Sequence, residues 1–230
     1  MIKVTFVSMW HSIVPASAAL LCDELAALLQ QEDEIEFWFH SCHLPTSQWF
    51  LKQIIKLKVH AHAEIKIVDV VDPLVDDGLI REAAEQLQYD KFEVDGDVRI
   101  QYAPDLNSRM KCGSKHFLAR SNQVNRWMID QCDYLLAYYY EGIPNRATSY
   151  VRHGSRNPNV TVISVIDRNT ASQIEKRIGE IEGRKRLILD GIRNGRTYKS
   201  IGDEFHISSS RVMQITDRVF QKIMYAIHDE

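Results

Sequence analysis

Residues 122–142, NQVNRWMIDQCDYLLAYYYEG, pass from a helical pattern to a strongly apolar run within a few positions. We predict a helix over Lys115–Gln131 and a buried strand over Tyr134–Tyr139, followed by a turn that contains Gly142. A helix that leads directly into a buried strand is typical of a parallel sheet covered by helices.

The same alternation of strand and helix patterns continues on both sides of this stretch. Further strands are predicted at residues 2–8, 35–40, 64–70, 98–102 and 160–166, and further helices from Pro15, from near Pro45 and over 147–153. Alternating strands and helices joined by short loops predict an α/β fold, a Rossmann-like parallel sheet with helices on both faces. Residues 72–113 are acidic at their start and ambiguous in period, so we interpret them as an insertion or a lid over the sheet edge.

From Asp167 onward the pattern is helical throughout. After a connecting helix, three helical patterns cover Lys185–Arg193, Tyr198–Phe205 and Ser208–Ile227. We therefore predict two domains. Residues 1–167 form an α/β ligand-binding domain, residues 168–182 a connecting helix, and residues 183–230 a small all-α helix-turn-helix domain.

Charge is unevenly distributed along the 230 residues, although the net charge is only −3. Residues 181–230 contain nine Lys/Arg and seven Asp/Glu, a net charge of +2, and the remaining 180 residues carry −5. This asymmetry has the sign expected for a tail that contacts nucleic acid, whereas the whole chain is not a general polyanion binder.

The four cysteines are widely spaced and contain no Cys-x-x-Cys pair, so we expect reduced thiols. The chain starts directly with a strand pattern and has no apolar stretch of membrane-spanning length, which predicts a cytoplasmic protein without a membrane partner. His40, Cys42 and His43, with His11 or with His60 and His62, match no closed zinc spacing, so we expect a loop cluster and no metal.

The segment from Gly195 to Ile223 has the features of a helix-turn-helix. Thr197 is suited to begin one helix, His206-Ile207 to form the turn, and Ser208 to begin the next helix. Apolar residues of the second helix recur at three- and four-residue steps and leave a polar N-terminal face, which a DNA major groove accepts.

Residues 183–226 resemble region four of the bacterial primary sigma factors. The resemblance rests on Gly195-Arg-Thr, Ile201-Gly202, Ile207-Ser208 and Arg211-Val-Met-Gln-Ile-Thr-Asp-Arg218. It implies double-stranded DNA as a partner, with Gln214 kept as a family-type base reader and Ser209, Ser210 and Met213 in place of the family's charged readers. The DNA-binding residues expected on this basis are Arg196, Thr197, Lys199, Ser208, Ser209, Ser210, Arg211, Gln214 and Arg218.

Residues 1–166 resemble the YpsA-like branch of the SLOG superfamily, a Rossmann-type nucleotide-binding fold. The resemblance rests on Asn125-Arg126, Asp133 at the strand entry, the strand exit at Tyr140-Glu141-Gly142, and the run from His153-Gly154 to 159–166. It implies a nucleotide-type ligand at the carboxyl ends of the strands. The family's Gly-Gly-Thr turn is replaced by Asn145-Arg-Ala-Thr148, where Arg146 could match a phosphate bidentately. The expected ligand-binding residues are Ser8, Trp10, Ser41, Arg126, Asp133, Glu141, Gly142, Arg146 and Thr148.

Together these patterns indicate a regulator in which a ligand-sensing sheet domain controls a DNA-binding tail. We expect no cofactor other than a nucleotide-derived ligand, no catalytic residue, and a homodimer or higher oligomer. Two alternatives stay open. One is a nucleotide N-glycosidase with a partner-binding tail, and the other is a non-catalytic interaction protein that docks RNA polymerase.

Overall fold

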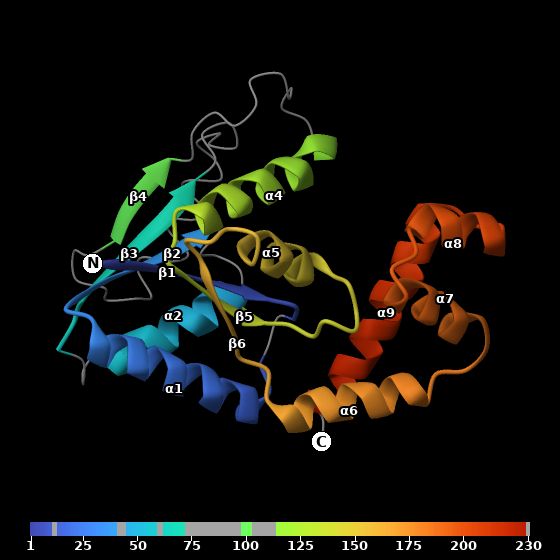
Figure 1. Ribbon diagram of the computed structural model, residues 1–230, viewed down its shortest axis with the longest axis horizontal. Helices are drawn as coiled ribbons and strands as arrows, with labels where there is room; N and C mark the ends of the chain where they lie inside the picture. The colour runs from blue at the N-terminus through green and yellow to red at the C-terminus, as the bar shows by residue number, and fades with distance from the viewer. Residues whose placement is uncertain (11–12, 41–44, 59–61, 72–97, 103–113, 229–230) are drawn as a thin grey trace.

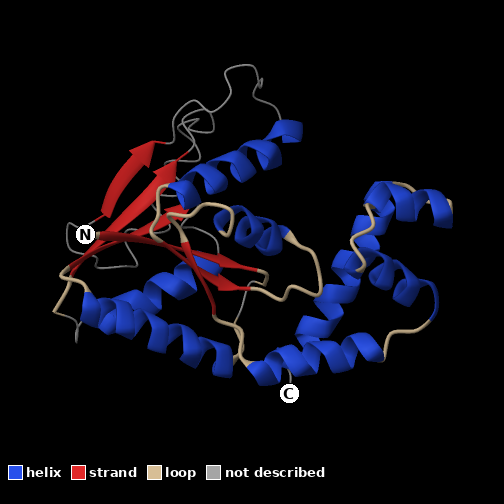
Figure 2. Ribbon diagram, viewed as in Figure 1, coloured by secondary structure: helices blue, strands red, loops and turns tan. Residues whose placement is uncertain are grey.

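The computed structural model describes residues 1–10, 13–40, 45–58, 62–71, 98–102 and 114–228. Six strands form one sheet: β1 (Ile2–Ser8), β2 (Glu34–His40), β3 (Glu64–Val71), β4 (Val98–Tyr102), β5 (Tyr134–Tyr138) and β6 (Thr161–Ser164). The order across the sheet is β4-β3-β2-β1-β5-β6, and each pair of neighbours is parallel (Figures 1 and 2). The predicted parallel α/β sheet is confirmed, with a change of winding direction between β1 and β5.

Eight helices are described around and beyond the sheet: α1 (Pro15–Gln31), α2 (Pro45–Lys58), α4 (Ser114–Asp130), α5 (Arg146–Gly154), α6 (Arg168–Gly179), α7 (Gly183–Arg193), α8 (Tyr198–Phe205) and α9 (Ser209–His228). Helices α1 and α2 cover one face of the sheet, and α4 and α5 cover the other (Figure 1). Parallel strands require such crossover helices because each connection must return to the starting edge.

Alternation along β2 shows how the two faces are filled. Phe37 packs edge-on against Phe50 of α2, with ring centroids 6.1 Å apart. The next residue, Trp38, points to the opposite face, where its ring centroid lies 6.1 Å from that of Trp127 on α4. Both faces of this strand are buried, so residues 35–39 do not alternate between apolar and polar, and the one polar residue, Glu36, accepts a hydrogen bond from the Trp38 indole N–H at 2.9 Å.

The helical tail begins with a strong cap. The Asp167 carboxylate accepts hydrogen bonds from the backbone N–H groups of Asn169 (2.9 Å) and Thr170 (3.0 Å), and α6 therefore begins at Arg168. Most of residues 72–113 lies outside the described part of the chain, so the interpretation of this stretch as an insertion or lid stays a prediction.

Helix α9 contributes to two hydrophobic cores. Near its start, Val212 packs with residues of α7 and α8 in a small cluster formed by Ile188, Ile192, Ile201 and Val212. Further along, five residues of α9 belong to the same core as the sheet: Val219, Phe220, Ile223, Met224 and Ile227. Helix α9 therefore joins α7 and α8 to the sheet domain.

Candidate functional site

The N-terminal half of α9 presents a polar surface. Ser208 precedes the helix, and its hydroxyl accepts a hydrogen bond from the Arg211 N–H at 3.2 Å, which satisfies one backbone donor of the first turn. The exposed side chains here are Ser208, Ser209, Ser210, Arg211, Met213, Gln214, Asp217 and Arg218. The opposite side is apolar, because Val212 is fully buried. The residues predicted from the sequence on this helix thus lie on one exposed surface.

The connection between α8 and α9 is tight. His206 adopts a left-handed conformation with φ of 52°, and the Ile207 N–H donates to the Gly202 carbonyl oxygen at 2.9 Å. A Cβ atom at Gly202 would lie 2.5 Å from the Ile207 carbonyl oxygen, so only glycine permits this approach. The angle between the two helices therefore depends on the Ile201-Gly202 pair recognised in the sequence.

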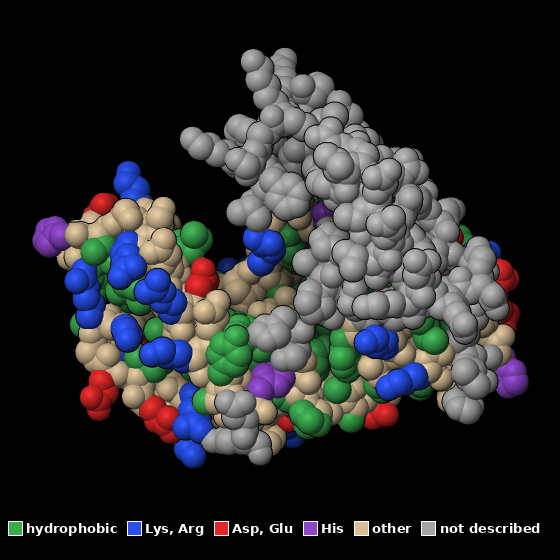
Figure 3. All heavy atoms as spheres, turned by 180° about the vertical axis from the view of Figure 1, so that it is seen from behind, with side chains coloured by type: hydrophobic (Ala, Val, Ile, Leu, Met, Phe, Trp, Pro, Cys, Tyr) green, Lys and Arg blue, Asp and Glu red, His purple; other side chains and the backbone are tan. Residues whose placement is uncertain are grey.

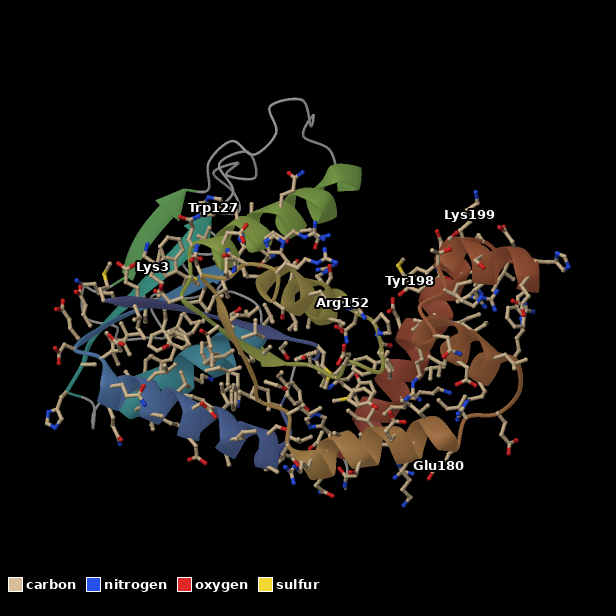
Figure 4. All side chains as sticks on the ribbon, viewed as in Figure 1. Lys3, Trp127, Arg152, Glu180, Tyr198 and Lys199 are labelled. Carbon is tan, nitrogen blue, oxygen red and sulfur yellow. The ribbon has the colours of Figure 1, made fainter. Side chains whose placement is uncertain are left out.

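The predicted residues of α8 have distinct environments. Thr197 caps the helix by accepting from the Ser200 N–H at 3.1 Å. The Arg196 guanidinium donates to the Glu204 carboxylate, so this positive charge is paired. Lys199 is exposed and lies at the outer side of α8, whereas Tyr198 lies on the side toward α5 (Figure 4). Lysine and arginine side chains gather over the C-terminal helices in the space-filling view (Figure 3).

The carboxyl end of β1 contacts α9. The Ser8 hydroxyl donates to the Trp10 carbonyl oxygen and accepts from the Trp10 N–H at 3.2 Å, which folds the chain sharply after the strand. The Trp10 ring is only 9% exposed and packs edge-on against Phe220 and Tyr225, with centroid distances of 5.9 and 5.2 Å. The structure thus uses Trp10 as a packing residue and leaves little of its ring for a ligand.

The loop after β5 contacts two helices of the tail. The Tyr140 hydroxyl donates to the Glu175 carboxylate on α6, and Arg193 of α7 pairs with the same carboxylate at 2.5 Å. A Cβ atom at Gly142 would lie 2.5 Å from the Tyr140 ring, so this glycine lets the loop fold closely over the tyrosine. Glu141 is exposed beside them.

Helix α5 begins at Arg146 with an internal capping box. The Asn145 side chain accepts from the Thr148 N–H at 3.0 Å, and the Thr148 hydroxyl accepts from the Asn145 N–H at 3.4 Å. Thr148 is 1% exposed, so its hydroxyl serves the helix cap. Of the two residues proposed to bind a phosphate here, only the exposed Arg146 is accessible.

A second arginine lies close to this helix start. Arg126 of α4 donates to the Ser149 hydroxyl at 3.3 Å, and the neighbouring Tyr150 hydroxyl donates to the Asn122 side chain at 2.7 Å. Burial raises the pKa of Tyr150, and the positive charges of Arg146 and Arg126 oppose that shift. Arg126 therefore reaches the helix that Arg146 begins, and an anion site would need such convergent guanidinium groups.

Two predicted ligand residues are not part of this group. Asp133 stands at the start of β5, at the opposite edge of the sheet from the strand exits, and accepts from the Lys3 N–H at 2.7 Å. Its role there is to join the amino ends of β1 and β5. Ser41 lies outside the described residues, as do Cys42, His43, His11 and His60 of the histidine and cysteine cluster.

Sequence reasoning missed Asp217, on α9. Burial raises the pKa of the Asp217 carboxyl, and the positive charge of Arg146, at the start of α5, opposes this shift. Tyr198 joins them, because its pKa is raised by burial and by the Asp217 charge. No local sequence pattern signals this group, since its members come from three separate elements.

An open groove of about 390 Å³ lies between α6, α7 and α9. Its floor is apolar and its rim mixes both charges, and the lining residues are Arg177, Glu180, Ile181, Glu182, Lys185, Val219, Lys222, Ile223 and Ala226. Within the described ranges, no three His, Cys, Asp or Glu side chains gather as a metal ion would need. The described helices also include none that is long and apolar enough to span a membrane.

Comparison with known proteins adds no family assignment. No protein-family model matches the chain, and no curated protein matches it in sequence.

Proposed function

We propose that this protein is a DNA-binding transcriptional regulator. In this proposal α8 and α9 form a helix-turn-helix that binds duplex DNA, and the sheet domain senses a nucleotide-type ligand. The observation that carries the proposal is the division of α9: one side of its first two turns packs on α7 and α8 and the other side is polar and exposed, while five residues of its later turns pack in the sheet core. A helix held by its apolar side, with its polar N-terminal side exposed, can enter a major groove.

The polar surface has the chemistry that DNA contact needs. Serine hydroxyls and arginine guanidinium groups bind phosphates, while glutamine and arginine also recognise base edges. Arg211, Arg218 and Lys199 are exposed and carry positive charge toward solvent. The resemblance to sigma region four covers the same residues and supports the same orientation.

The proposed sensor contacts the helical tail at two places. Trp10 packs on Phe220 of α9, and Tyr140 shares the Glu175 carboxylate of α6 with Arg193 of α7. The positive charge of Arg146 also acts on the Asp217 carboxyl of α9. An anionic ligand held by Arg126 and Arg146 would draw Arg146 away from Asp217. Ligand binding would then change how α9 is held, which is the differential interaction that a switch requires.

DNA binding is tested by retention on duplex DNA over a range of salt concentrations. We expect log affinity to fall linearly with log salt, and the double variant Arg211→Ala, Arg218→Ala to reduce the slope by about 1 for each lost phosphate contact. Arg156→Ala is the matched control, because Arg156 is exposed on the sheet domain. Equal slopes for the wild type and the double variant would contradict the proposed surface.

The sensor is tested separately with adenosine 5′-monophosphate and with inorganic phosphate as probes. We expect the nucleotide to raise the melting temperature of the wild type and to have no effect on the Arg126→Ala, Arg146→Ala variant. Release of free adenine would instead identify the N-glycosidase alternative. If neither probe shifts the melting temperature, the nucleotide-sensing part of the proposal is wrong, while the proposed DNA binding still depends on the duplex-retention experiment. Docking to a protein such as RNA polymerase would then be the function left for the sheet domain.

A further inference from the structure

We infer that α9 selects guanine through a preset pair of side chains, Arg211 and Gln214. This inference rests on the proposed function, because it concerns which base the helix reads. The Arg211 guanidinium donates to the Gln214 side-chain carbonyl at 3.2 Å, and both residues are exposed. They stand three positions apart, so they share one side of the helix.

This hydrogen bond changes what Gln214 offers to DNA. A free glutamine amide recognises adenine with both ends, accepting from the N6 amino group while donating to N7. In this pair the amide oxygen is engaged by Arg211, so Gln214 presents its N–H donors. Arg211 keeps further N–H groups for the groove, since guanidinium has five donors and no acceptor.

The donors of this pair fit guanine best. Guanine presents two acceptors, O6 and N7, in the major groove, whereas adenine and cytosine each present a donor that needs an acceptor on the protein, and thymine presents one acceptor, O4, beside its methyl group. Residues 209–216 contain no carboxylate that could accept from cytosine. The nearest one, Asp217, stands three positions after Gln214 and is not part of the pair. The pair therefore favours a G·C base pair with guanine facing the two side chains.

The inference is tested by selecting bound sequences from a random duplex pool at fixed salt, with wild type and two variants. We expect the wild type to enrich guanine at one position, with at least about a ten-fold loss when it is replaced by adenine. Arg211→Ala frees the Gln214 carbonyl, so it should shift this position toward adenine. Arg218→Ala is the matched control: it removes an exposed arginine of the same helix and should weaken binding to all sequences equally without changing the preferred base.

The outcomes distinguish a failure of this inference from a failure of the proposed DNA binding. A wild type that retains no duplex at any salt concentration overturns the proposed DNA binding, and the guanine preference with it. A wild type that binds DNA but enriches adenine, or no base, overturns only the role of the pair. An Arg211→Ala variant that keeps the guanine preference also overturns it. Circular dichroism confirms that each variant is folded before it is compared.

Discussion

The indole ring of Trp10 and the phenol ring of Tyr225 meet edge-on, with their centroids 5.2 Å apart. Trp10 follows β1 at the centre of the sheet, and Tyr225 lies near the end of the last helix. Phe220 contacts the same indole at 5.9 Å. Aromatic pairs of this geometry contribute about 0.5–1.5 kcal/mol beyond the area they bury. The contact therefore helps fix α9 to the sheet edge at which a ligand is proposed to bind.

Replacing Trp10 by alanine should loosen this attachment. We expect the free energy of unfolding to fall by roughly 3 kcal/mol, the lower end for truncation of a buried aromatic ring, because the ring lies at the margin of the core. Urea denaturation followed by circular dichroism measures the change. Trp10→Phe keeps a ring against Tyr225 and should lose less. Equal losses in the two variants would show that ring contact does not hold the helix.

The shared carboxylate of Glu175 gives a second prediction. Glu175→Gln keeps the size of the side chain but removes the charge that Arg193 pairs with. Because the two side chains are 46% and 27% exposed, we expect a loss of stability below about 1 kcal/mol. A double-mutant cycle with Arg193→Ala measures the pair. A coupling energy of zero would mean that the ion pair has no role in holding α7.

Gly202 tests the close approach of α8 and α9. Alanine at this position would bring Cβ to 2.5 Å from a backbone oxygen, so the helices must separate, at a cost of about 1–3 kcal/mol. Duplex retention should fall with the melting temperature. Gly179→Ala is the control, because a Cβ atom there meets nothing within 4 Å. The proposed geometry would be refuted if both alanine variants had wild-type stability and DNA retention.

Local patterns in the sequence were sufficient for most of the secondary structure. The predicted bounds of β1, β4 and α8 coincide with those observed. Strand β6 is shorter than predicted, four residues against seven, because pairing with β5 limits its length. The spacing of apolar residues along a helix or strand shows which of its sides is buried, and this spacing can be read from the residues of that element alone.

The arrangement of the candidate sites could be predicted only in part. The exposed residues of α9 follow from its helical period, so their common surface was predictable. The burial of Trp10 was not, because it depends on how β1 and α9 pack, which lie far apart in the sequence. Asp133 shows the same limit: its place at the amino edge depends on its pairing with Lys3 of β1.

Asp167 connects the two parts of the chain and makes stability depend on pH. Its carboxylate accepts from the Ser17 hydroxyl of α1 at 2.7 Å and caps α6 through Asn169 and Thr170. Burial alone would raise its pKa. The hydrogen bonds from Thr170, Ser17 and Asn169 outweigh burial, so the pKa of Asp167 lies below its usual value of 3.8. A carboxyl with a lowered folded-state pKa stabilises the protein fully above its unfolded-state pKa, and this contribution is lost as the pH falls through the folded-state value.

Two substitutions separate the charge of Asp167 from its role as a cap. Asp167→Ala removes both, and we expect it to cost about 1 kcal/mol at pH 7, the usual value of a lost N-cap. Asp167→Asn retains an oxygen that can cap α6 but does not titrate. Urea denaturation between pH 7 and pH 3 should therefore show a smaller acid-induced loss of stability for the asparagine variant than for the wild type, because its folded and unfolded states no longer bind different numbers of protons at this residue. Parallel losses in the wild type and the asparagine variant would place the acid sensitivity elsewhere in the chain.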